Sequence, residues 1–217
     1  MKIKYFIGGY DQNLCYLIWC DISKKAAIID PAVQIAPIIK HINKEKLKLE
    51  KIFITHSHGD HIQYLRNFMH EYKNKLKIYI SNKTQLQRLN SKCLVSSNQV
   101  INLGYEDIVC LETPGHYYDS MCFWSPKNKI VFTGDTMFIG RTGRTIREGS
   151  NIKDLYNSIY KVLLKLPKDT IIYSGHDYGE KIFDNMSNNI SSSSFFSCKS
   201  LKEFIDVMAK YEKNRKN

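Results

Sequence analysis

Thr55-His-Ser-His-Gly-Asp-His61 is the stretch that decides the fold, and it follows directly after the apolar run Lys51-Ile-Phe-Ile-Thr55. That run is short, β-branched and aromatic, which is typical of a buried strand. Because His56 and His58 are two residues apart, an extended backbone can direct both imidazoles at one point. Gly59 then permits a sharp change of direction before the last two side chains. Imidazoles combined with a carboxylate favour zinc, iron or manganese over calcium or magnesium.

A helix is expected directly after this loop. Apolar residues recur at helical spacing through 62–69, so we predict a helix over 61–73. An isolated histidine pair is more often surface decoration or a capping group than a metal ligand. Four metal-capable side chains between a strand and a helix favour a metal site, because later turns of the chain supply further ligands.

The H-x-H-x-D-H pattern resembles the metallo-β-lactamase superfamily, and three later turns agree with that family. They are Thr113-Pro-Gly-His116, Thr133-Gly-Asp135 and Ser174-Gly-His176, in the family's order. The resemblance implies an α+β fold, the αββα sandwich, in which two mixed β-sheets pack face to face with helices outside. Without the resemblance, the pattern of elements indicates only a mixed α and β fold.

The resemblance also implies a metal centre with two zinc ions. The ligands would be His56, His58 and His116 for one ion, Asp60, His61 and His176 for the other, and Asp135 as the bridge. A water held between two divalent ions is a nucleophile near neutral pH, and the ions polarise a carbonyl, so the implied reaction is hydrolysis. Asp60 could also accept or pass a proton, which makes it the candidate catalytic residue.

An alternative enzyme uses the same side chains. His56, His116 and Asp135 form the two-histidine, one-carboxylate set of non-haem iron oxygenases. The persulfide dioxygenases of this superfamily resemble the chain and keep the full motif, yet they use one iron. The complete set of seven ligands favours a dinuclear zinc thioesterase similar to glyoxalase II (hydroxyacylglutathione hydrolase), with the iron dioxygenase as the alternative.

Two segments bear on the substrate. Phe138-Ile-Gly-Arg-Thr-Gly-Arg-Thr145 is similar to the corresponding segment of glyoxalase II-like hydrolases and persulfide dioxygenases, and so is Gly175-His-Asp-Tyr178. Arg141 or Arg144 could face a substrate carboxylate, or could anchor the loop to acidic side chains. Tyr178 is expected to hydrogen-bond the substrate. The expected substrate is therefore a small anionic thioester.

The chain departs from glyoxalase II in several places. Only 41 residues follow His176, too few for the additional C-terminal helical domain with which that enzyme holds glutathione. Thr145 or Ile146 stands where that group has an aromatic residue, and the bulky run 117–119 is expected to narrow the pocket. The chain resembles most the short, one-domain glyoxalase II-like hydrolases.

Length and composition indicate a single domain over 1–217, which the resemblance implies is of the metallo-β-lactamase type. The 217 residues are 43% hydrophobic, enough for one large core. The net charge is +11, but the lysines are dispersed, so no nucleic-acid partner is expected. Six scattered cysteines without C-x-x-C are typical of free thiols in the cytoplasm. No membrane association is expected. No signal peptide is expected either, and without export β-lactam cleavage is disfavoured. A homodimer is possible.

The remaining elements follow from periodicity and turn residues. An antiparallel meander is expected over 5–30, and a helix over 32–44 whose start Pro37 delays or kinks. Further strands are expected at 76–80, 99–103, 108–111, 121–124, 129–133 and 169–173. Further helices are expected at 83–90, at 151–165 with Ser150 as its cap, and at 199–213, with a loop at 185–198.

Overall fold

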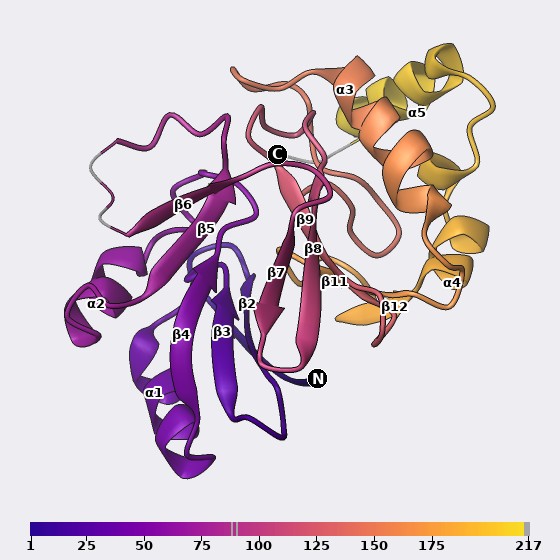
Figure 1. The fold of residues 1–217 in the computed structure, drawn as a ribbon. Coiled ribbons are helices and arrows are strands. Elements are labelled where there is room, and N and C mark those ends of the chain that lie inside the picture. The colour runs from indigo at the N-terminus through magenta and orange to yellow at the C-terminus, as the bar shows by residue number, and fades with distance from the viewer. Residues whose placement is uncertain (88, 90, 215–217) are drawn as a thin grey trace.

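Two six-stranded sheets pack face to face in the computed structural model, which describes residues 1–87, 89 and 91–214 (Figure 1). The first sheet has the order β1 (Lys2–Gly8), β2 (Asn13–Trp19), β3 (Lys25–Ile29), β4 (Lys48–Phe53), β5 (Lys77–Ser81) and β6 (Lys92–Val95). The second has the order β12 (Phe183–Asn185), β11 (Ile171–Ser174), β10 (Ile130–Gly134), β9 (Met121–Ser125), β8 (Glu106–Glu112) and β7 (Val100–Leu103).

Both sheets are mixed. β1, β2 and β3 form the predicted antiparallel meander, and β3 to β6 pair in parallel. In the second sheet only β10 and β11 are parallel. The helices α1 (Ile35–Lys44) and α2 (Leu65–Glu71) cover the outer face of the first sheet, and α3 (Ile152–Asn157) and α5 (Leu201–Asn214) cover that of the second (Figure 1). The αββα sandwich is therefore confirmed.

β2 shows why the sheets take this arrangement. Every one of its side chains is buried, as expected for a strand covered on both faces. Leu14 and Tyr16 point into the core between the two sheets, whereas Cys15 and Leu17 point into the core beneath α1 and α2. Successive side chains of a strand face opposite ways, so one continuous apolar run serves two cores.

Several predicted boundaries in the first two thirds of the chain are wrong. The helix predicted from residue 32 begins at Ile35, in agreement with the delay expected from Pro37. Pro37 is the third residue of α1, in the first turn, where no partner for its missing N–H is needed. The segment predicted as a helix at 83–90 contains no helix at 83–87 or 89, and residues 88 and 90 lie outside the described part. Residues 92–95, where no strand was predicted, form β6.

Caps explain the differences in the last third. Asn151, not Ser150, caps α3 by accepting a hydrogen bond from the Asp154 N–H at 3.0 Å. The rest of the predicted helix continues as a π turn and a 3₁₀ turn to residue 165. The predicted loop at 185–198 instead contains α4 (Met186–Ser192), which Asn185 caps. Asparagine and serine serve both as loop residues and as helix caps, so composition alone did not distinguish the two.

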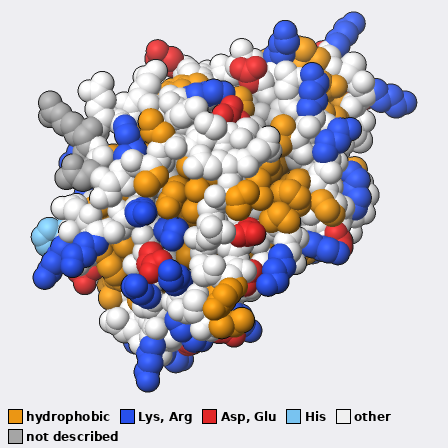
Figure 2. Space-filling model, viewed as in Figure 1, with side chains coloured by type: hydrophobic (Ala, Val, Ile, Leu, Met, Phe, Trp, Pro, Cys, Tyr) orange, Lys and Arg blue, Asp and Glu red, His pale blue; other side chains and the backbone are white. Residues whose placement is uncertain are grey.

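Surface features of the described residues agree with a globular chain. No helix among them combines the length and the apolar character needed to cross a membrane. Figure 2 shows lysine and arginine side chains scattered across one face instead of gathered in a single patch.

Candidate metal centre

Four strand ends meet at one edge of the sandwich and carry the predicted ligands. The loop after β4 carries 56–61, and the turns after β8, β10 and β11 carry the ligands His116, Asp135 and His176. Two backbone hydrogen bonds join the sheets at this edge, from Met121 N to Thr55 O at 2.7 Å and from Leu14 N to Gly175 O at 2.8 Å. The packing of the two sheets therefore sets the distance between the two halves of the site.

Three histidines form the first group of donors. His56 Nε2 lies 2.9 Å from His58 Nδ1, which lies 3.1 Å from His116 Nε2. Nitrogens that share a tetrahedral zinc ion at its usual bond length are about 3.3 Å apart. The three ring nitrogens therefore converge with the spacing that a shared cation requires.

Asp60, His61 and His176 form the second group. His176 Nε2 is 3.2 Å from His61 Nε2 and 3.3 Å from Asp60 Oδ2. Asp135 lies between the groups, because its Oδ2 is 3.6 Å from His116 Nε2 and 3.4 Å from His176 Nε2. The buried Asp135 Oδ1 has no hydrogen-bond partner among the described residues, which is expected of an atom that faces a cation. All seven predicted ligands are thus brought together, and the donor set fits a metal centre.

The outward-facing nitrogens of three histidines are held by hydrogen bonds. The opposite Nε2 of each ring is therefore directed at the cluster, where it can bind a metal once its proton is displaced. The pairs are His61 Nδ1 with Asp30 Oδ2 at 2.8 Å, His116 Nδ1 with Arg144 O at 2.9 Å, and His176 Nδ1 with Asp11 O at 2.7 Å.

Asp30 is a site residue that was not predicted from the sequence. Its carboxylate is 1% exposed and accepts hydrogen bonds from Thr55 N at 2.7 Å and Thr55 Oγ1 at 2.6 Å, besides His61. It therefore ties β3 to the liganding loop. The signal for it in the sequence is a charged residue directly after the apolar run 26–29.

Asn13 is a second missed residue. It is fully buried, and its Nδ2 donates to Asp60 Oδ2 at 2.9 Å. This contact fixes the orientation of the Asp60 carboxylate, which is the predicted proton acceptor. No local spacing indicated it, because Asn13 and Asp60 come together only when β2 pairs within the first sheet.

The protein's own charges divide the site into two halves. Burial and the neighbouring His116 lower the pKa of His58 to about 4, so this side of the site is neutral at pH 7. Burial also opposes charge on His176, but Asp135 and Asp60 outweigh it and raise the pKa to about 10. Burial likewise disfavours ionised Asp135, yet His61 and His176 hold its pKa well below the ordinary value. The carboxylates therefore stabilise positive charge at the centre of the cluster.

The site needs a glycine at position 175, and not at Gly59 where the sequence suggested one for the turn. Gly59 has no left-handed φ, and a Cβ there would meet nothing within 4 Å, so the turn does not require glycine. At Gly175, by contrast, a Cβ would lie 2.3 Å from Asp135 Oδ1 and 2.6 Å from His61 Cε1. Gly175 therefore leaves the space that the ligands occupy.

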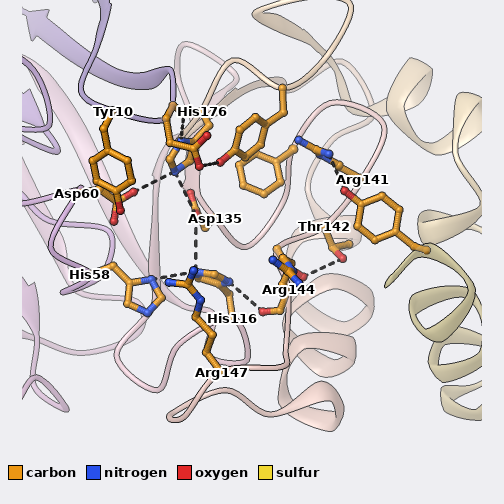
Figure 3. Close-up of a pocket in the computed structure, with 15 residues that line it drawn as sticks. Tyr10, His58, Asp60, His116, Asp135, Arg141, Thr142, Arg144, Arg147 and His176 are labelled. Atoms are coloured by element: carbon orange, nitrogen blue, oxygen red, sulfur yellow. Dashed lines mark hydrogen bonds and ion pairs between the residues drawn. The ribbon is translucent and has the colours of Figure 1, made fainter. Parts of the chain in front are cut away.

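A cavity of about 130 Å³ opens beside the cluster and is lined by the three predicted substrate residues (Figure 3). Arg144 donates to both carboxylate oxygens of Glu212 at 2.8 and 2.7 Å, so it anchors its loop to an acidic side chain. Arg141 lies 4.2 Å from the centre of the Tyr178 ring. The run 117–119, expected to narrow the pocket, does not line the cavity; the Tyr117 ring packs against His58 instead.

Comparison with known proteins agrees with this geometry. The family model of the Metallo-beta-lactamase superfamily matches residues 8–93 and 98–176. A probable hydroxyacylglutathione hydrolase, glo2 of Schizosaccharomyces pombe, is 33% identical over 94% of this chain and 77% of its own length. A hydroxyacylglutathione hydrolase of Francisella tularensis subsp. novicida is 32% identical over 90% and 75%. The crystal structure of ETHE1 from Myxococcus xanthus has a TM-score of 0.88 and 27% identity, and covers 100% of this chain and 93% of its own.

Proposed function

Because this chain belongs to the metallo-beta-lactamase superfamily, we propose that it is a dinuclear zinc hydrolase that cleaves small anionic thioesters. The observation that carries the proposal is the convergence of seven donor side chains, in two groups joined by Asp135, at the mouth of a cavity. The two relatives named as hydroxyacylglutathione hydrolases support the thioester as the scissile group.

The ligands divide as the family resemblance implies. One zinc ion would be held by His56, His58 and His116, and the other by Asp60, His61 and His176, with Asp135 between them. Bound there, the ions would supply an activated water and polarise the thioester carbonyl.

Asp60 is the candidate for handling the proton at this site. Burial disfavours its charge, but hydrogen bonds from His176 and Asn13 hold its pKa well below the ordinary value, so Oδ2 is an ionised acceptor at neutral pH. Asn13 and His176 both contact this same oxygen, which keeps the carboxylate directed into the cluster. The second oxygen is left to accept a proton from a group bound in the cavity.

The test combines elemental analysis with a thioester assay. Protein purified without added metal should contain about two zinc ions per chain if the proposed donor set is filled. The zinc-loaded protein should then hydrolyse lactoylglutathione, seen as loss of thioester absorbance, and Asp135→Asn should abolish both properties. Full metal loading without cleavage of any thioester in a panel of acyl groups would refute the hydrolase.

A one-iron persulfide dioxygenase is the second candidate. It is supported by the two-histidine, one-carboxylate set within the cluster, where His116 Nε2 lies 3.6 Å from Asp135 Oδ2. About one iron per chain, together with oxygen uptake in the presence of glutathione persulfide, would replace the hydrolase by this activity.

A further inference from the structure

Three arginines line the cavity, and two of them are already engaged by the C-terminal part of the chain. Arg144 makes a two-pronged ion pair with Glu212 of α5. Arg141 donates to the Tyr211 hydroxyl at 2.5 Å and packs over the Tyr178 ring. A guanidinium held at both prongs must give up its partner before it can bind a second carboxylate.

Arg147 differs from the other two. Its side chain is exposed and lines the same cavity, and it makes no ion pair or side-chain hydrogen bond with residues 1–87, 89 or 91–214. Figure 3 shows it extending from its loop toward His58 and His116, on the opposite side of the site from Arg141. The permanently charged guanidinium therefore stands at the rim without a partner from the described chain.

The size of the cavity and the metal ligands inside it both place a carboxylate of the thiol carrier at this rim. The cavity volume is about 130 Å³, which leaves room for a short acyl group but not for a peptide-sized thiol carrier. Asp60 and Asp135 line its interior as predicted metal ligands, so the metal centre and the scissile group fill that space. A carrier that projects outward would instead bring its carboxylates within reach of the rim.

We infer that Arg147 is a specificity-determining residue, which binds a carboxylate of the substrate's thiol carrier while Glu212 keeps Arg144 as a loop anchor. The inference rests on the proposed thioester hydrolysis and adds to it the residue that selects anionic substrates. It adds Arg147 to Arg141 and Arg144, the arginines predicted from the sequence.

The kinetic test compares a substrate that has two free carboxylates with its diethyl ester, in which both negative charges are removed. We would measure kcat/KM for S-lactoylglutathione and for its diethyl ester with zinc-loaded wild type, Arg147→Gln and Arg66→Gln, an exposed arginine of α2. Loss of one charge-assisted hydrogen bond predicts that Arg147→Gln lowers kcat/KM about tenfold for the substrate with free carboxylates, mostly through a higher KM. The ester should change less than about twofold, and Arg66→Gln should change neither. Equal losses for both substrates would overturn the inference and leave the hydrolase intact.

A binding measurement keeps the inference testable if hydrolysis fails. S-hexylglutathione is a thioether and cannot be hydrolysed, so its Kd can be measured by calorimetry whatever reaction the protein catalyses. Arg147→Gln should weaken this binding about tenfold, with no change for the diethyl ester. Absence of thioester cleavage together with this weakening would refute the hydrolase and support Arg147. An unchanged Kd, or no binding to wild type, would overturn the role of Arg147.

Discussion

Replacing Asp30 by asparagine removes the charge that fixes the orientation of His61. The wild-type Oδ2 accepts from Thr55 Oγ1 at 2.6 Å and from His61 Nδ1 at 2.8 Å. In Asp30→Asn, an NH2 group replaces one of the two carboxylate oxygens. This NH2 group faces either Thr55 Oγ1 and His61 Nδ1 or, if the side chain turns over, the Thr55 N–H. If the amide donates to His61 Nδ1, the ring proton must move to Nε2, the atom that faces the cluster. The substitution therefore acts on the metal site without a change in side-chain size.

The expected magnitude follows from these contacts. Loss of a supporting carboxylate behind a liganding histidine typically costs about 10–100-fold in metal affinity. Two charge-assisted hydrogen bonds are weakened, so the free energy of unfolding of the metal-free protein should fall by about 2–3 kcal/mol. Asp30 has φ 51, a region that asparagine also tolerates, so no new backbone strain is added.

Zinc competition against a chromophoric chelator and urea unfolding of the metal-free protein would measure the two effects separately. Asp21→Asn is the matched control, because Asp21 is exposed and pairs only with Lys24. Its zinc affinity should equal that of wild type. Wild-type zinc affinity in Asp30→Asn, with or without a loss of stability, would refute the argument that the carboxylate orients His61.

Three further predictions test the site. Gly175→Ala should cost at least about tenfold in zinc affinity, because its Cβ would contact Asp135 and His61. Gly59→Ala should bind zinc as wild type does, because a Cβ there meets nothing. Similar zinc titrations of the two variants would contradict this prediction. Glu212→Gln should lower the free energy of unfolding by no more than about 1 kcal/mol, since its ion pair with Arg144 is partly exposed. It should also lower kcat/KM, because the Arg144 backbone carbonyl holds His116. An unchanged kcat/KM would show that this ion pair does not support the site. Zinc affinity should rise with pH between 6 and 9, by up to about tenfold per pH unit. The reason is that the metal must displace the proton that His176 holds below its pKa of about 10. Competition with a chelator at three pH values would measure this, and an affinity independent of pH would contradict it.

Local sequence motifs were enough to predict the candidate metal ligands and, together with the family resemblance, the fold class. Liganding residues that follow a strand within one short loop are positioned by local backbone geometry, so the run from His56 to His61 could be interpreted without a structure. The same holds for the turns that carry His116, Asp135 and His176, each placed at a strand end. The two sheets also followed from strand patterns together with the family resemblance, because buried strands leave continuous apolar runs.

Tertiary contacts, by contrast, establish how the candidate ligands are supported and which arginines of the cavity are held by α5. Asp30 and His61 are 31 positions apart, and Arg144 and Glu212 are 68 apart, so no periodicity relates them. Their contacts form when the two sheets pack and α5 folds back over the second one. Side chains that act through such distant contacts have no signal in local sequence, because their role depends on what the rest of the chain brings beside them.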